Sequence, residues 1–378
     1  MIYYAILMAV VGMYAFLLSS TNLLELNRLT KKTKRQKKTP RVSVCIPARN
    51  EHDNIERCLK SFMKQDYPDY EVLVLDDNSE DDTAAIVERL SKEDNRIRLI
   101  HGTPLPKGWK GKVHAMQQLY EHATGTYLLF TDADTTHQSI SIRLGVDLAI
   151  SNNAKFVSGY PTETCRKPII ASCIACMVFN TMLYLPIPLQ NRIQKSWFSM
   201  AIGQYVLVER QSLKEIGGME KIKNAICDDV QLARTFAKTG HKQIFCDMKR
   251  AASCKMYESF NEAFTGIERS VAGAIKLSPM LFIGTVFLVI ILLGFIASPI
   301  VSVIALIMTG VNTTSLLLLS GTILFWGSFA MVTTFHGYHF PVQLMGQLTF
   351  LFVIIMYVHG LYLKRSGHGF VWKGRKII

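Results

Sequence analysis

The segment Thr126-Tyr-Leu-Leu-Phe-Thr-Asp-Ala-Asp134 places two carboxylates directly after an apolar run. The apolar part has the composition of a short buried strand. Ligands of open α/β sheets bind outside the carboxyl ends of the strands, so Asp132 and Asp134 are expected to lie in a cleft. Two close carboxylates repel each other unless they are protonated or bridged by a cation. Because hard oxygen ligands suit Mg2+ or Mn2+ beside a substrate phosphate, the segment predicts a metal-bound diphosphate, although both aspartates could merely cap the helix that follows His137.

Two earlier segments repeat this arrangement of a strand with polar residues at its end. Val42 to Ile46 is a predicted strand, followed by Pro47-Ala-Arg-Asn-Glu51 and a helix from about Asn54 to Lys64. A second predicted strand, Glu71 to Leu75, ends in Asp76-Asp77-Asn-Ser79. Alternating strands and helices predict a mostly parallel sheet with right-handed crossovers, in which these strand ends meet at one edge.

A third unit is predicted further along the chain. Asp81-Asp82 begin a helix, with acids where the helix dipole favours them, and Ile97 to Ile100 form a third strand. The loop Pro106-Lys-Gly-Trp-Lys-Gly-Lys112 then precedes a helix that runs to Ala123. Glycines and lysines at a helix start suit phosphate, although a solvated turn has the same composition.

The composition indicates a globular part joined to membrane segments, because 49% of the residues are hydrophobic while 19% are charged. The uncharged run Ile2 to Leu18 is followed by a basic block with no acid, residues 28–38. Nucleic acid is one possible partner for such a block. Basic residues beside an apolar helix more often mark its cytoplasmic flank and meet anionic lipid. We therefore expect a retained anchor at residues 1–22, a basic cytosolic linker at 23–40 and no nucleic-acid partner; a cleaved signal peptide would have its positive charge before the apolar run.

Neither the cysteines nor the histidines form a recognisable metal or disulfide pattern. Cys173 and Cys176 lie in an apolar run without a second ligand pair, and the other six cysteines have no framework spacing. We expect reduced, core-packing cysteines and no zinc site.

Together these motifs resemble the inverting family 2 glycosyltransferases of the GT-A fold, which use nucleotide-diphosphate sugars. The resemblance covers roughly residues 40–275 and rests on several motifs in the order of that family: Pro47–Glu51, Leu75–Ser79, Gly111-Lys112, Asp132-Ala-Asp134, Gly203-Gln204 and Cys227-Asp-Asp229. It implies an α/β, GT-A nucleotide-diphospho-sugar transferase fold at residues 41–257. The variants Gly108-Trp-Lys-Gly-Lys112, Gly203-Gln-Tyr-Val206 and Val371-Trp-Lys-Gly-Arg375 look like bacterial carotenoid and hopanoid-associated enzymes, which act on lipids.

The resemblance also implies roles for individual residues. Asp77 with Asp76 would hold the uridine, Arg49 and Glu51 would line the nucleotide pocket, and Lys112 would face the diphosphate. Asp134 would bind the metal, and Asp132 would complete the donor site.

Asp229 would be the general base, and general-base chemistry independently requires such a carboxylate to take the proton of the acceptor hydroxyl. Asp228 and Gln204 would lie near the acceptor. Without the resemblance, Asp228 and Asp229 would read as the N-cap and first turn of a helix at Val230 to Lys238, and Gln204 as a core residue.

The chain departs from the polymer-forming members of that family, which carry a Q-x-x-R-W motif on an interfacial helix. Here the counterpart is Gly266-Ile-Glu-Arg269-Ser270, so only Arg269 matches, as a diphosphate contact. Residues 258–278 have apolar side chains at helical spacing and could lie on the membrane or dock onto the domain. Pro168 to Leu185 is uncharged, but if it crossed the bilayer Asp134 and Asp229 would lie on opposite sides. It is expected to be a membrane-surface or domain-packing segment, with a plain core helix as the alternative.

Residues 279–363 form a second apolar region, with breaks at Ser298-Pro299, Asn312 to Ser315 and His336 to Pro341. The tail at 364–378 is basic and is expected to be cytosolic, and Trp372 would suit the membrane interface. The resemblance instead implies that Trp372 to Arg375 fold beneath the active site. An even number of crossings is then required, and we favour four, one of them short.

The sequence therefore predicts a multi-pass inner-membrane hexosyltransferase whose catalytic domain faces the cytoplasm. It would transfer one sugar, with glucose favoured, from a UDP-sugar to a lipid such as a carotenoid acid or hopanoid, with inversion and with Mg2+ or Mn2+. A processive polysaccharide synthase and a non-catalytic membrane scaffold of the same fold are the alternatives.

Overall fold

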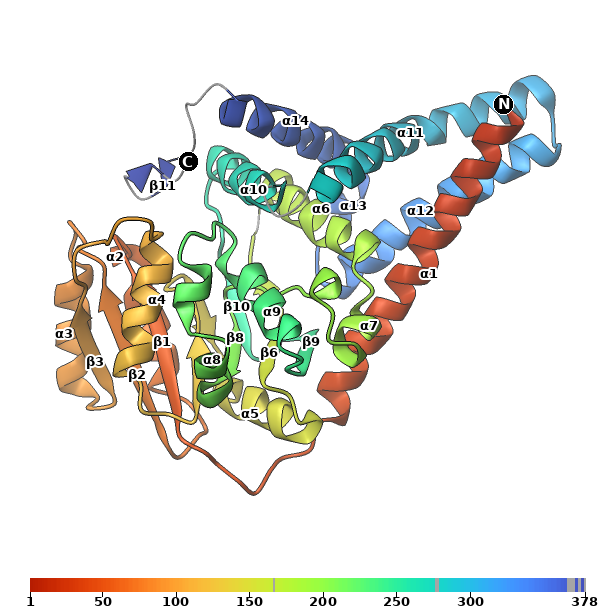
Figure 1. Cartoon of the computed structure of the whole chain (residues 1–378). Helices are drawn as coiled ribbons and strands as arrows, with labels where there is room; N and C mark the ends of the chain where they lie inside the picture. Colours follow the sequence, from red (N-terminus) through yellow and green to blue (C-terminus); the bar gives the residue numbers. More distant parts are fainter. Residues whose placement is uncertain (166, 276–278, 366–370, 373–374, 377–378) are drawn as a thin grey trace.

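A seven-stranded sheet, ordered β3-β2-β1-β4-β8-β6-β9, forms the centre of the globular domain (Figure 1). The computed structural model describes residues 1–165, 167–275, 279–365, 371–372 and 375–376. Within this sheet β8 runs antiparallel to both neighbours, whereas the other adjacent pairs are parallel. The mostly parallel α/β sheet is therefore confirmed. In chain order the strands are β1 (Val42–Ala48), β2 (Tyr70–Asp76), β3 (Ile97–His101), β4 (Tyr127–Phe130), β6 (Phe156–Tyr160), β8 (Val206–Glu209) and β9 (Gln243–Asp247).

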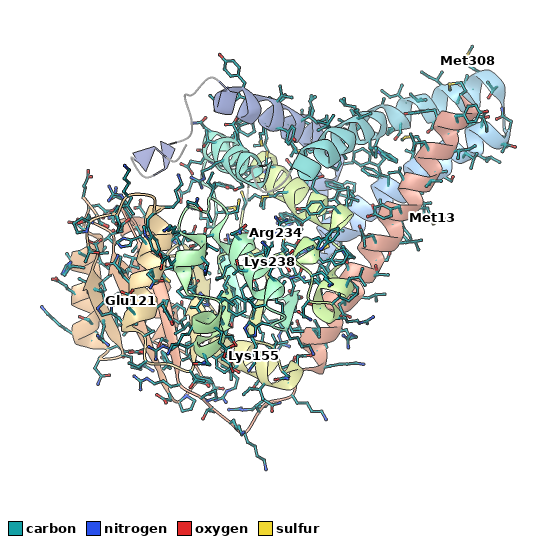
Figure 2. All side chains as sticks on the ribbon, viewed as in Figure 1. Met13, Glu121, Lys155, Arg234, Lys238 and Met308 are labelled. Atoms are coloured by element: carbon teal, nitrogen blue, oxygen red, sulfur yellow. The ribbon has the colours of Figure 1, made fainter. Side chains whose placement is uncertain are left out.

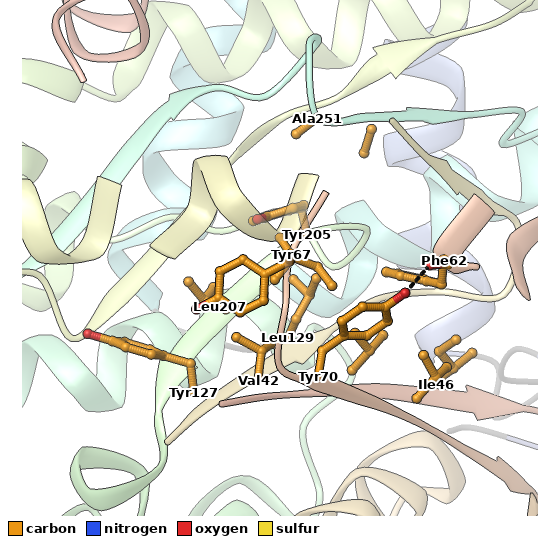
Figure 3. Packing of buried hydrophobic residues seen from close by; sticks show 14 of the residues in the cluster. Val42, Ile46, Phe62, Tyr67, Tyr70, Tyr127, Leu129, Tyr205, Leu207 and Ala251 are labelled. Carbon is orange, nitrogen blue, oxygen red and sulfur yellow. Dashed lines mark hydrogen bonds between the residues drawn. The ribbon is translucent and has the colours of Figure 1, made fainter. Parts of the chain in front are cut away.

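Helices cover both faces of this sheet. Alternate side chains of its central strands therefore enter two separate cores. Val44 of β1 belongs to one core and Cys45 to the other. Figure 3 shows part of the first core, in which the Tyr70 hydroxyl donates to the carbonyl of Phe62 at 2.7 Å. The helices are α2 (His52–Phe62), α3 (Thr83–Glu93), α4 (Gly111–His122), α5 (Ser141–Asn152), α8 (Arg210–Glu215) and α9 (Asp228–Lys238), with single 3-10 turns at Ser196–Phe198 and Met219–Ile222. A small sheet of β5 (Thr135–His137), β10 (Ala252–Cys254) and β7 (Thr162–Glu163) lies beside the larger one.

Three long helices, α1 (Ile2–Lys32), α11 (Pro279–Thr309) and α12 (Thr313–Phe335), form an arm that projects from the domain (Figure 1). Met13 and Met308 lie on this arm, whereas the labelled charged side chains lie on the domain (Figure 2). Within the described residues, the stretches long and apolar enough to cross a membrane are Ile2–Lys32, Val289–Thr309 and Thr313–Phe335. The arm therefore supports membrane association.

Of the four expected C-terminal crossings, one of them short, two are matched in the described residues by helices of full length, α11 and α12. Pro299 lies inside α11 and does not divide it. Its ring removes one backbone hydrogen bond, but the Ser298 hydroxyl donates to the carbonyl of Phe295 at 2.9 Å, so this group remains satisfied. The remaining apolar helix, α14 (Gly346–Arg365), contains a shorter apolar stretch, Gly346–Gly360.

The expected linker also differs, because residues 23–32 continue α1 rather than forming a loop. Polar side chains in this part and directly before it are buried against the domain. The Asn22 amide donates to the carbonyls of Met182 at 3.2 Å and Leu185 at 2.8 Å, and the Thr30 hydroxyl donates to that of Asp247 at 2.8 Å. These hydrogen bonds join α1 to the domain.

A layer of helices connects the arm to the carboxyl edge of the sheet (Figure 1). Most of α6 is buried, and it packs against α14 and α10, which is the domain-packing alternative for Pro168 to Leu185. Ala263 and Ile267 of α10 are buried on these neighbours, so α10 docks onto the protein. Residues 373 and 374 of the predicted tail motif lie outside the described residues. The helices of this layer are α6 (Pro168–Tyr184), α7 (Ile187–Arg192), α10 (Phe260–Ile275), α13 (Phe340–Leu344) and α14; β11 (Val371–Trp372) and β12 (Arg375–Lys376) form a short C-terminal hairpin.

Candidate active site

A cavity of about 1230 Å³ lies between the carboxyl edge of the central sheet and the helical layer. Asp76, predicted to help hold the nucleotide, is outside its lining. Its carboxylate instead accepts the Ser79 backbone N–H at 3.3 Å and closes the turn after β2. The other predicted site residues all line the cavity: Arg49, Glu51, Asp77, Lys112, Asp132, Asp134, Gln204, Asp228, Asp229 and Arg269.

The ends of β1 and β2 form the predicted nucleotide end of the cavity. The Arg49 guanidinium donates to the carbonyls of Asp77 at 2.6 Å and Asn78 at 3.0 Å. Asn50 and Asn78 both have positive φ, +52° and +55°, a conformation that asparagine tolerates better than most residues. Arg49 therefore fixes the loop that presents Asp77, which a motif alone does not reveal.

Lys112 is the centre of the acidic part of the site. Its ammonium lies 2.7 Å from a carboxylate oxygen of Asp132 and 3.5 Å from one of Asp228. Burial alone would lower the pKa of Lys112, but the surrounding carboxylates of Asp132, Asp228 and Asp229 raise it above its ordinary value. Lys112 is thus a fixed positive charge in the first turn of α4.

Asp229 projects into the cavity from the start of α9. In the described chain the N-cap of this helix is Cys227, and no side-chain cap bond is formed. Neither aspartate is therefore the N-cap, although both lie in the first turn. The Asp229 carboxylate accepts the Val230 N–H at 2.8 Å. Burial raises the pKa of Asp229 to about 7, and repulsion by Asp228 adds to the shift. A carboxylate with this pKa suits proton abstraction near neutral pH.

Asp134 lies on the other side of the acidic cluster, where the Thr135 hydroxyl donates to it at 3.2 Å. Burial raises the pKa of Asp134 to about 7, with repulsion from Asp132 and Glu51 adding to it. Excess negative charge on hard oxygen atoms fits a divalent cation. In the described residues no three His, Cys, Asp or Glu side chains converge as a metal site, so such a cation would need further oxygen ligands from a diphosphate and water.

Gln204 reaches the cavity because β8 runs antiparallel, which brings its amino end to the edge where β1, β2 and β4 end. The Gln204 amide donates to Cys254 Sγ at 3.6 Å. Gly203, directly before it, lies among the charged groups of the site: an added Cβ would be in ordinary van der Waals contact with Lys112 Nζ at 3.4 Å and with oxygens of Asp132 and Asp229 at 3.5 Å.

Sequence reasoning missed several residues of the lining. Glu163 follows β6 without any motif, and Arg234 lies in the middle of α9. His336 and Tyr338 come from the corner between α12 and α13. The only sequence signal for this corner was the polar break at His336 to Pro341.

The sequence model of glycosyl transferase family 21 matches residues 4–378. The chain is a family 21 glycosyltransferase. The glycosyltransferase assignment and the GT-A fold are thus confirmed, although the family is family 21 and not family 2. The resemblance to carotenoid and hopanoid-associated enzymes is not shown.

Among curated relatives of this glycosyltransferase, GalNAc(5)-diNAcBac-PP-undecaprenol beta-1,3-glucosyltransferase of Campylobacter jejuni is 36% identical over 25% of this chain and 30% of its own. The UDP-Glc:alpha-D-GlcNAc-diphosphoundecaprenol beta-1,3-glucosyltransferase of Escherichia coli is 30% identical over 31% of this chain and 44% of its own. The chain thus matches less than half the length of these two relatives.

A solved mannosyltransferase from Pyrobaculum calidifontis, in complex with GDP-Man and Mn2+, covers 95% of this chain and 99% of its own, with a TM-score of 0.56. Because its sequence identity is 18%, the similarity concerns the fold alone.

Proposed function

We propose that this family 21 glycosyltransferase transfers one sugar, with glucose the first candidate, from a UDP-sugar to a lipid acceptor. The mixed lining of the cavity carries this proposal. It combines charged residues that suit a sugar nucleotide with apolar side chains of α6, namely Ile174, Met177 and Val178. One cavity can therefore receive a polar donor and an amphiphilic acceptor. The undecaprenol-linked substrates and the UDP-Glc in the relatives' names support the same donor and acceptor classes.

The chemistry proposed for the site is a single displacement. The Asp229 carboxylate takes the proton of the acceptor hydroxyl as its oxygen attacks the anomeric carbon, which contributes about 10²- to 10⁴-fold to the rate. Lys112 and Arg269 stabilise the charge that develops on the departing diphosphate. A divalent ion held by Asp134, with Asp132 beside it, would neutralise further charge on the diphosphate. One displacement inverts the anomeric centre.

We propose that the arm spans the cell membrane and that the domain faces the cytoplasm. Lys31, Lys32 and the following basic residues lie at the domain end of α1, which is the flank that positive residues mark as cytoplasmic. Three candidate crossings, one before and two after the domain, keep both the domain and the tail on that side. UDP-sugars of the cytoplasm would then have access to the site.

Transfer of labelled sugar to lipid tests the proposal directly. The protein, purified with its arm and placed in nanodiscs, should transfer label from UDP-[14C]glucose into the organic phase of a lipid extract, and Asp229→Asn should reduce this transfer at least a hundredfold. NMR of the product should show the inverted anomer. Absence of transfer with UDP-glucose, UDP-galactose and UDP-N-acetylglucosamine would refute the enzyme and favour a scaffold, whereas long sugar chains would favour a polysaccharide synthase. The carotenoid acid and hopanoid acceptors stay predictions, and products from lipid extracts that contain each would test them.

A further inference from the structure

Exposed apolar side chains gather at one place on the globular domain. Of the described residues between 33 and 270, the large hydrophobic side chains that are exposed are Leu105, Tyr184, Leu189, Ile193 and Trp197. All but Leu105 lie between the end of α6 and the 3-10 turn that follows α7, and Trp197 is 74% exposed. Single exposed apolar residues are normal, whereas a group of them indicates a surface that something else covers. We call the exposed side chains of residues 184–197 the α7 surface.

The charge of the α7 surface is positive. Residues 164–208 contain no aspartate or glutamate, and Arg192 and Lys195 are exposed among the apolar side chains. Glu25 of α1 acts electrostatically on Arg192, but its two carboxylate oxygens are already bonded by the Arg28 guanidinium at 2.8 Å. The α7 surface therefore keeps a net positive charge. Apolar side chains interspersed with cations are typical of segments that lie in an anionic headgroup layer.

The position of α7 along α1 puts this surface at the level of the headgroups. The Asn22 side chain accepts the Ile187 N–H at 2.9 Å and donates to the Leu185 carbonyl at 2.8 Å. Asn22 comes four residues after Leu18, the end of the apolar run, which is about 6 Å along a helix axis. A headgroup layer is roughly 5 to 8 Å thick on each side of the hydrocarbon core. When α1 crosses the membrane, α7 therefore begins within that layer.

The α7 surface is also continuous with the arm. Figure 1 shows α7 beside α1, where the arm meets the domain. The bilayer that surrounds α1 thus reaches this surface directly, whereas a second copy of the chain would bring the same positive charge to the contact and be repelled. Tyr184 and Trp197 line the cavity as well, so the cavity opens at this surface.

We propose that the α7 surface is a second membrane contact of this enzyme. Its apolar side chains enter the boundary between headgroups and acyl chains, a depth that suits Trp197 because its ring is apolar and its N–H is polar. Arg192 and Lys195 bind the anionic headgroups of phospholipids. The proposal rests on the membrane topology proposed above and goes beyond it, because it joins the globular domain itself to the bilayer.

Nitroxide labels measure the depth of this contact without turnover. The full chain, with the partly exposed Cys165 and Cys227 replaced by serine, is labelled at Ile193→Cys or Trp197→Cys. It is placed in nanodiscs that contain phosphatidylcholine and phosphatidylglycerol. Electron paramagnetic resonance then compares the collisions of the label with oxygen, which concentrates in lipid, and with a water-soluble nickel chelate.

Two reference labels calibrate the depth. Met13→Cys on the arm reports lipid, and Lys92→Cys at an exposed position of α3, on the side of the domain away from the arm, reports water (Figures 1 and 2). We expect the ratio of oxygen to nickel collisions at residues 193 and 197 to shift from the water reference towards the lipid reference.

A charge variant tests the anionic headgroups. With the label at Ile193→Cys, the double variant Arg192→Gln/Lys195→Gln should lower the ratio of lipid-exposed to water-exposed label about tenfold or more. Nanodiscs of phosphatidylcholine alone should remove the difference between this variant and its parent. Lys64→Gln/Lys92→Gln, which removes two positive charges from exposed positions elsewhere on the domain, is the matched control and should leave the ratio unchanged.

Each other outcome has a distinct meaning. Collisions typical of water at both α7 labels, while Met13→Cys reports lipid, would overturn the membrane contact. A depth that is the same with and without phosphatidylglycerol would overturn the binding of anionic headgroups. Dipolar broadening between labels would assign the α7 surface to a second copy of the chain and overturn the proposal. If Met13→Cys also reports water, the proposed topology fails and the contact with it. Sugar transfer is not measured, so an inactive protein can show the contact and an active one can lack it.

Discussion

The ammonium of Lys112 lies 2.7 Å from a carboxylate oxygen of Asp132. The same ammonium is 3.5 Å from Asp228, so one lysine links the acids after β4 with those that begin α9. These segments are nearly a hundred residues apart in the chain, and each carries charge that the other would repel. Lys112 thus has two expected tasks, to hold the acidic cluster together without substrate and to face the diphosphate when it binds.

Replacing Lys112 by methionine should affect both tasks. The raised pKa of Lys112 means that its stabilising charge is fully present below about pH 10 and is lost only as the pH rises above that value, so Lys112→Met should lower the melting temperature throughout pH 5 to 9. The Kd for UDP should rise about tenfold or more, as for loss of a charge-assisted hydrogen bond. Lys107→Met, in the exposed part of the same loop, is the control for calorimetry and melting. An unchanged UDP affinity would exclude Lys112 from the diphosphate site.

Asp229 separates chemistry from binding. Asp229→Asn keeps the shape but cannot accept a proton, so kcat should fall about 10²-fold or more while the Kd of UDP hardly changes. Asp228→Asn should be milder. In the wild type the acid limb of the plot of kcat/KM against pH should have its midpoint near 7, the pKa to which burial raises Asp229. Near-normal turnover of Asp229→Asn would refute the base assignment.

The same carboxylate makes a prediction for stability. The folded-state pKa of Asp229 is about 7 against an ordinary 3.8, so the folded protein binds the proton more tightly than the unfolded chain. Its ionisation therefore costs stability progressively as the pH rises from about 4 to 7, and the cost persists above 7. Asp229→Asn should melt higher than the wild type at pH 8 and by a smaller margin at pH 5, and the difference should vanish only below about pH 4. A lower melting temperature at pH 8 would show that the carboxylate is a structural element of α9.

The metal prediction concerns Asp134. Excess negative charge around this residue predicts that UDP binds weakly after chelation and that Asp134→Asn loses the dependence on Mg2+ or Mn2+. Calorimetry of UDP with and without EDTA measures the first effect, and loss of the free Mn2+ signal in electron paramagnetic resonance measures binding of the ion without turnover. Asp82→Asn, an exposed aspartate outside the cavity, is the control. Equal UDP affinity with EDTA would refute the metal role.

The sequence predicts the strands that end in polar residues and the carboxylates at their ends, because apolar runs that alternate with helices are enough to predict a parallel sheet. It does not predict that β8 is reversed, since a strand of four residues, Val206–Glu209, carries no directional signal. Nor does it reveal the length of α1. Asn22 and Glu25 are polar residues expected beyond the end of an apolar helix. They are nevertheless buried within α1, where the backbone of α6 and Asn191 of α7 provide hydrogen-bond partners.

Site residues from the membrane half could not be predicted for a related reason. His336 and Tyr338 have no motif and acquire their place only when α12 packs against α6 and α1. Pro299 suggested a break that the structure does not have. A proline that would end a helix in water is tolerated in an apolar helix, because Ser298 satisfies the carbonyl that the proline leaves free.

The proposed topology can be tested by cysteine labelling. In a background in which the partly exposed Cys165 and Cys227 are serine, Lys37→Cys should react with a membrane-impermeant maleimide only after the cells are opened. Val311→Cys, in the exposed turn between α11 and α12, should react in intact cells. The reverse pattern would place the domain outside and remove its access to cytoplasmic UDP-sugar.

The last prediction concerns the crossing of α1 and α12, where Gly12 and Gly321 let the two backbones approach closely. A Cβ on Gly321 would lie 2.5 Å from the carbonyl oxygen of Met8, and one on Gly12 would meet the carbonyl oxygen of Gly321. Backbone cannot move aside as a flexible side chain can, so Gly321→Leu should separate the helices and lower the melting temperature in detergent, with Gly321→Ala intermediate. Gly327→Leu is the matched control, because an added Cβ there meets nothing within 4 Å. Equal stability of Gly321→Leu and Gly327→Leu would show that the crossing does not hold the arm together.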